Sequence, residues 1–177
     1  ESRITVFYDF PWDYILHFTG GEAQPSQPLP TGCSAPDVMR YAAWTEDYGW
    51  LPFVADLDDF AGIQGHWVRY LAIDMGGHGW YQVRTMDGGC LPKVRGCDTG
   101  DFEGGCAGDG SPILAVRCYY ETADPSATGY WCAEYRTSNA WQGYFAWQRD
   151  DEECNGQDGF AGDGANPIDR FQLHLAQ

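Results

Sequence analysis

The chain has 177 residues, of which 44% are hydrophobic and 16% aromatic, and its 10 Lys and Arg face 26 Asp and Glu, giving a formal net charge of −16. This length predicts one domain, and the aromatic content excludes a disordered acidic tail. The charge excludes a nucleic-acid-binding protein, which needs clustered Lys and Arg. No stretch approaches the roughly 18 uncharged apolar residues of a membrane helix, so we predict no membrane insertion.

The first predicted element is a leader, residues 1–35. Segments 4–10 (ITVFYDF) and 12–18 (WDYILHF) are rich in aromatic and β-branched residues, which predicts two strands joined near Pro11. A Pro-rich, exposed connection follows them. We expect the leader to complete a sheet.

Three repeated units follow the leader, approximately 36–76, 77–124 and 127–177. Sliding the chain by 40 residues aligns 41–54 with 81–94, and seven of the fourteen positions are identical. A second landmark, an Ala-Gly turn followed by an alternating segment, occurs in all three units. In the third unit we align Trp141 with Trp50. Such internal similarity is typical of repeat architectures, in which one unit cannot bury its apolar face alone.

Each unit is predicted to consist of β-strands. In the segment YLAIDM, Leu71, Ile73 and Met75 alternate with the residues between them, as strand residues do. No segment shows a helical apolar period, so helix should be scarce. We therefore predict a single all-β domain with three-fold pseudo-symmetry. A β-prism is favoured, with a β-trefoil as the alternative.

Cysteine usage points to a secreted protein. Seven Cys accompany 23 Gly and 10 Pro in a chain that begins at Glu1, which predicts an extracellular, disulfide-stabilised protein whose signal peptide has been removed. The spacings do not resemble zinc-ligand pairs. Bridges are expected between Cys97 and Cys106 and between Cys118 and Cys132. The odd cysteine stays free, is capped, or joins two chains into an oligomer.

The first unit resembles a known repeat. Gly49-Trp50, the Ala61-Gly62 turn, Arg69 and Ala72-Ile73 are similar to the clostridial hydrophobic-W (ChW) repeat, with the best match over residues 41–75. The second and third units depart from this pattern, with Cys90 at the Trp column and Asp169 at the Arg column. The resemblance implies an extracellular binding module that recognises carbohydrate or cell surfaces. It implies no catalytic residues.

Aromatic residues beside polar turns are the candidate binding platforms. Trp50 and Trp141 share a column with Cys90, which indicates core positions. The better sugar-stacking candidates are the unrepeated Trp67, Trp80, Trp131 and Trp147, although ordinary partial burial is the alternative for each.

Polar candidates come from the turns themselves. The second and third units share Ala-Gly-Asp-Gly, which places Asp109 and Asp163 beside flexible backbone, with Asn166 nearby. These carboxylates either bind a ligand or cap their own turns. The first unit has Ile63 in that column, leaving Gln64 and His66 as its polar groups.

Acidic loops precede each Ala-Gly turn, and Ca²⁺ is the metal that such oxygen ligands would hold. The candidate ligands are Asp58, Asp101 and Asp158, and the alternative is that these loops are solvated faces. No cofactor is required by any motif.

Together these features predict a secreted, lectin-like protein that binds carbohydrate or a glycoconjugate at up to three related sites. No catalytic residue is assigned, because the four His are scattered and no nucleophile, zinc or phosphate-loop motif occurs. A protein-binding module, such as an adhesin, toxin subunit or inhibitor, is the alternative. A small glycosidase ranks third.

Overall fold

The computed structural model describes residues 35, 37–153 and 158–177, and the predicted leader strands lie outside these residues. The described part is built from β-strands, as predicted, with one four-residue helix, α1 (Pro125–Thr128). None of the helical residues in these ranges forms a segment long and apolar enough to cross a membrane.

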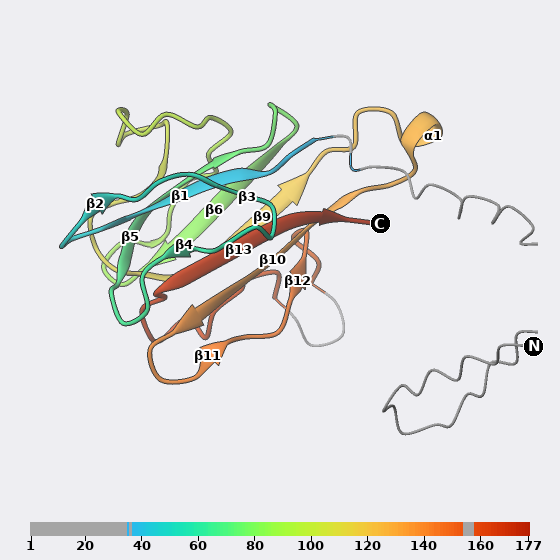
Figure 1. Cartoon of the computed structure of the whole chain (residues 1–177). Helices are drawn as coiled ribbons and strands as arrows, with labels where there is room; N and C mark the ends of the chain where they lie inside the picture. The colour runs from blue at the N-terminus through green and yellow to red at the C-terminus, as the bar shows by residue number, and fades with distance from the viewer. Residues whose placement is uncertain (1–34, 36, 154–157) are drawn as a thin grey trace, which may run out of the picture. The chain divides into compact units, whose positions relative to one another are not determined.

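Three long antiparallel hairpins form the framework (Figure 1). They pair β1 (Arg40–Thr45) with β5 (Val68–Asp74), β6 (Gly79–Thr85) with β9 (Ile113–Tyr120), and β10 (Cys132–Asn139) with β13 (Arg170–Ala176). Leu71 and Ile73 of β5 are buried as predicted, but Ala72 between them is buried as well, so β5 does not alternate strictly. The inward side chains of the three hairpins form one apolar cluster.

Short strands extend each hairpin. They are β2 (Gly49–Trp50), β3 (Val54–Ala55), β4 (Ala61–Gly62), β7 (Gly89–Cys90), β8 (Ala107–Gly108), β11 (Gly143–Tyr144) and β12 (Gln148–Arg149). The resulting sheets have the orders β2-β1-β5-β8, β7-β6-β9 and β11-β10-β13-β4, with β3 on β1 and β12 on β10. We refer to them by their central hairpins as the β1/β5, β6/β9 and β10/β13 sheets.

Each Ala-Gly turn pairs with a hairpin other than its own. β4 pairs with β13, β8 pairs with β5, and Ala161 forms a bridge with Val116 of β9. The first hairpin is thereby joined to the third, the second to the first, and the third to the second. These pairings form a closed cycle within the described residues.

Glycine makes these close approaches feasible. Gly62, Gly108 and Gly162 have φ angles of 122°, 150° and 127°. A Cβ atom on them would lie 2.1, 2.3 and 2.4 Å from the carbonyl oxygens of Asp169, Arg69 and Leu114, respectively. Only a residue without a side chain allows both the backbone conformation and the contact.

A buried tyrosine recurs in the first strand of each hairpin. Tyr41 donates to the carbonyl oxygens of Asp56 and Asp59, and Tyr81 donates to those of Gly96 and Gly105. Tyr135 donates in the same way to Asp150 and Gly159. Burial raises the pKa of all three hydroxyls, so they remain donors that fix the connecting loops to the core.

The described cysteines are free thiols in the structure. The predicted bridges Cys97–Cys106 and Cys118–Cys132 are not formed in it, and Cys33 and Cys154 lie outside the described residues. The ends of the loop between Cys97 and Cys106 nonetheless meet, because the amide of Asp98 donates to the carbonyl of Gly105 at 2.8 Å.

Candidate functional site

An aromatic cluster covers the outer face of the β1/β5 sheet. Trp44 of β1 and Tyr70 of β5 are cross-strand partners, with ring centroids 5.7 Å apart in an edge-to-face arrangement. Phe102, from the loop before β8, packs edge-to-face on Tyr70 at 4.7 Å, and Trp50 stacks beside Phe102. The indole of Trp50 also donates to the carbonyl of Thr99, which ties β2 to that loop.

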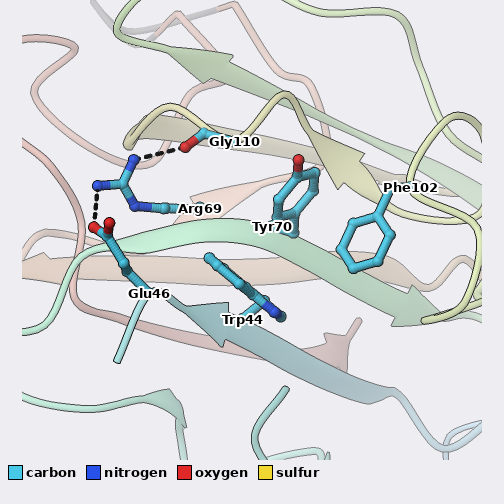
Figure 2. A pocket seen from close by; sticks show the side chains of 6 residues that line it. All are labelled: Trp44, Glu46, Arg69, Tyr70, Phe102 and Gly110. Atoms are coloured by element: carbon cyan, nitrogen blue, oxygen red, sulfur yellow. Dashed lines mark hydrogen bonds and ion pairs between the residues drawn. The ribbon is translucent and has the colours of Figure 1, made fainter. Parts of the chain in front are cut away.

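A charged pair borders this cluster (Figure 2). Arg69 of β5 donates to the Glu46 carboxylate at 2.5 Å and to the Gly110 carbonyl at 2.6 Å. The Arg69 side chain is 20% exposed and the Glu46 side chain 69% exposed, so the carboxylate remains accessible to solvent. The Nε atom of Arg69 is buried without a partner.

These groups line a cavity of about 320 Å³, bounded by Trp44, Glu46, Arg69, Tyr70, Phe102 and Gly110. In Figure 2, the three rings lie on one side of it and the ion pair on the other. Burial raises the pKa of the Tyr70 hydroxyl, which is therefore neutral and can donate a hydrogen bond. The cavity combines apolar ring surface with a carboxylate, a guanidinium and a hydroxyl.

A second, smaller cavity of about 130 Å³ shares Glu46 and Arg69 with the first. The remaining lining includes Asp47, His66 and Trp67, and the His66 Nδ1 atom lies 2.8 Å from the Asp47 carboxylate. Two residues predicted to bind ligand, His66 and Trp67, therefore lie next to the main cavity. Gln64 is exposed on the same turn.

Asp109 and Asp163 are engaged with their own turns. Asp109 accepts from the amide and hydroxyl of Ser111 and from the hydroxyl of Thr85. Asp163 accepts from the amides of Ala165 and Asn166 and from the Asn166 side chain. Partial burial alone would raise the pKa of both carboxyls, but these hydrogen bonds outweigh it and lower the pKa. The geometry favours turn capping, and ligand binding by these residues stays a prediction.

Trp147 lies on the β10/β13 sheet, apart from both cavities. Its ring is contacted by the Arg136 guanidinium, 4.3 Å from the ring centroid, and by the His174 ring at 5.1 Å. A stacking platform needs a free ring face, and these contacts occupy part of the indole surface. Trp147 is therefore a weaker platform than the rings of the β1/β5 sheet.

The core positions predicted for the repeated tryptophans are wrong. Trp50 is only partly buried, Cys90 is exposed, and the Trp141 side chain is 65% exposed. Strand pairing also places Tyr144, not Trp141, opposite β10 as Trp50 is placed opposite β1. The turns before β2 and β11 have the same length, since Thr45 pairs with Gly49 and Asn139 with Gly143. Matching tryptophan to tryptophan therefore placed the alignment three residues out of register.

The predicted calcium ligands do not converge. Asp101 accepts from the amides of Glu103 and Gly104, and Asp158 accepts from the amide of Phe160. Asp58 is exposed in the first unit. Among the residues with described positions, no three His, Cys, Asp or Glu form a group that could hold a metal ion. Calcium binding stays a prediction.

Sequence reasoning missed Trp44, Glu46, Tyr70 and Phe102 as site residues. A signal was present for Tyr70, because it precedes Leu71 in a strand whose inward residues were recognised, and Trp44 is its partner on β1. Phe102 could not be found this way, since its loop is distant in sequence.

No protein-family model, curated protein or solved structure matches the chain. The resemblance to the ChW repeat therefore stays a prediction, and the site alone supports a function.

Proposed function

We propose that this protein is a secreted carbohydrate-binding protein whose main site is the cavity on the β1/β5 sheet. The observation that carries the proposal is an aromatic cluster, not covered by Arg or Lys side chains, beside an accessible carboxylate. Sugars are bound by aromatic surface against their C–H groups and by carboxylates or amides on their hydroxyls. The aromatic surface comes from Trp44, Tyr70 and Phe102, and the polar groups for the hydroxyls come from Glu46 and Arg69.

Comparison of the three sheets supports this choice of site. On the β6/β9 and β10/β13 sheets, the outward rings lie under Arg or Lys side chains. On the β1/β5 sheet, the rings of Trp44, Trp50, Tyr70 and Phe102 contact one another, and no cation–π contact involves them among the described residues. Their surface is available to a neutral sugar.

The proposal includes a β-prism architecture. Its support is the division into separate sheets joined in a cycle, where a β-trefoil would require the hairpins to close one barrel. Val68, Ile113 and Ile168 hold equivalent places at the proposed three-fold axis, where the amide of Val68 donates to the Ile168 carbonyl and that of Ile168 to the Ile113 carbonyl. The other two units would then be diverged copies of the binding unit.

A disulfide between Cys97 and Cys106 also belongs to the proposal. The hydrogen bond between Asp98 and Gly105 brings the two ends of the loop together, and this loop carries Phe102. Oxidation in an extracellular environment would hold Phe102 over the cavity. Peptide mapping of the secreted protein under nonreducing conditions tests it, and a Cys97 linked to any other cysteine would contradict it.

A glycan array followed by calorimetry tests the proposed function. We expect Trp44→Ala to weaken sugar binding by about two- to tenfold, since stacked aromatic contacts contribute roughly 0.5–1.5 kcal/mol. Trp141→Ala is the matched control, because it removes an exposed indole that lies outside both cavities. Equal affinities of the two variants would contradict the site. An array without any binder would favour the alternative, a protein-binding module that uses the same rings as a hot spot.

A further inference from the structure

A row of basic side chains runs over the outer face of the β6/β9 sheet. We call it the basic ladder and define it by Lys93, Trp80, Arg117, Phe160 and Arg84. Lys93 Nζ lies 3.4 Å from the Trp80 ring centroid, and the Arg117 guanidinium lies between the two rings, 5.7 Å from Trp80 and 4.7 Å from Phe160. The Arg84 guanidinium lies 4.6 Å from Phe160.

The rings hold the cations in place. Trp80 and Phe160 are 5% and 7% exposed, so each ring is buried beneath the charged groups that cover it. Cation–π contacts of this kind restrict long side chains before any ligand arrives. Part of the conformational entropy that binding would otherwise cost has therefore already been lost in the free protein.

Charge pairing within the ladder is incomplete. The chain has 26 Asp and Glu for 10 Lys and Arg, yet Arg84 and Lys93 form no ion pair within the described part of the chain. Arg117 has one carboxylate partner, Glu153, at 3.3 Å, and this glutamate side chain is 70% exposed. The Nε atom of Arg117 is buried without an acceptor.

Basic side chains with so few carboxylate partners are unusual in so acidic a protein. Two guanidinium groups share one ring, and an acceptor placed between them would relieve their mutual repulsion. Carboxylates and sulfates accept charge-assisted hydrogen bonds from guanidinium groups in a planar, two-point arrangement. Glu153 contacts Arg117 from the solvent side, where such an external anion would bind, and would be displaced by it.

We propose that the basic ladder is a second binding site that takes an anionic sugar residue, a uronate or a sulfate ester. The anionic part of this inference depends only on the ladder. Its saccharide part depends on the proposed function. At positions equivalent to Arg84 and Arg117, the β1/β5 sheet has Trp44 and Ala72, so the two faces would select neutral and acidic sugars, respectively.

Calorimetry with a matched pair of ligands tests the proposal. The probes are a glucuronate-containing oligosaccharide and its counterpart with glucose in place of glucuronate. We expect the wild-type protein to prefer the acidic probe by about tenfold, and to lose this preference as salt is raised and screening shortens the range of the charges. Absence of any preference at low salt would overturn the proposal.

Two double variants distinguish an effect of the ladder residues on binding from an effect of the protein's net charge. Arg84→Gln with Lys93→Gln should abolish the preference for the acidic probe. Arg40→Gln with Arg95→Gln changes the net charge equally but lies outside the ladder, and should leave the preference unchanged. Equal losses in both double variants would show a general charge effect and would overturn the site.

A gain-of-binding variant gives an independent readout. Glu153→Gln removes the carboxylate that occupies Arg117 and should strengthen binding of the acidic probe several-fold. Trp44→Ala should weaken binding of the neutral probe and leave the affinity for the acidic probe unchanged, so failure of the main site and failure of the ladder are distinguishable. Tighter binding of a glutamate-rich peptide than of the acidic sugar would also overturn the proposal.

Discussion

Replacing the glycine of an Ala-Gly turn with alanine tests whether the hairpin cycle maintains the fold. The turn in question is the one at Gly62. At a φ of 122°, an L-residue is strained by about 1–3 kcal/mol. The added Cβ would also lie 2.1 Å from the Asp169 carbonyl, a backbone atom that cannot rotate away. Overpacking of this kind costs about 1–3 kcal/mol more.

We therefore expect Gly62→Ala to lose about 2–6 kcal/mol of unfolding free energy. At about 2–4 °C per kcal/mol for a protein of this size, Tm should fall by roughly 4–24 °C. Gly108→Ala and Gly162→Ala should behave alike, since their Cβ atoms would meet the carbonyls of Arg69 and Leu114. Urea unfolding followed by tryptophan fluorescence gives the free energies, and calorimetry gives Tm.

Gly77→Ala is the control. Its φ of 81° is also positive, but a Cβ there would have no atom within 4 Å, so only backbone strain of about 1–2 kcal/mol is expected. The difference between the two variants isolates the close approach between hairpins. A Gly62→Ala protein no less stable than Gly77→Ala would refute the pairing of β4 with β13.

Two further predictions concern buried polar groups. The Thr45 hydroxyl is buried without a partner, whereas that of Thr85 donates to Asp109 at 2.9 Å. Thr45→Val should therefore raise the free energy of unfolding by up to about 1 kcal/mol, and Thr85→Val should lower it by a similar amount. Urea unfolding that shows a change of the same sign for both variants would contradict this. Burial raises the pKa of the Asp150 carboxyl despite hydrogen bonds from the amides of Tyr120 and Ala133. The folded protein therefore favours the protonated carboxyl, and its stability falls as pH rises from the ordinary Asp pKa through the raised one. Asp150→Asn should thus gain in Tm relative to the wild type as pH rises above about 4, the ordinary Asp pKa, and a Tm difference that does not change with pH would refute this.

The sequence predicted those features that follow a short period. Burial alternates along β13, and Leu71 and Ile73 of β5 were identified as buried, although Ala72 is buried too. The Ala-Gly turns were recognised because a small residue repeats there. The cavity depends instead on contacts between segments far apart in sequence. Phe102 reaches Tyr70 from a loop of the second unit, and no local pattern indicates that approach.

Alignment of repeats was the second source of error. Trp141 was matched to Trp50 because both are tryptophans, while the register of β10 with β11 places Tyr144 there. The turns before β2 and β11 are equally long, so the equivalence follows from strand register and not from residue type. The carboxylates of Asp109 and Asp163 show a related limit, since capping a turn and binding a ligand both require an Asp at the same position in the turn.

The pairing of β4 with β13 determines the order in which the strands can pair during folding. Arg170 and Phe171 pair with Gly62 and Ala61, so a segment near the start of the described chain acquires its partner only when the last strand exists. During synthesis, the first hairpin would expose an unpaired edge until that point, and such edges are templates for association with other chains. Because loop closure over so long a separation is slow, the final joining of first and last hairpins should be the late step of folding, and a truncation that removes β13 should leave an aggregation-prone remainder rather than a smaller stable domain.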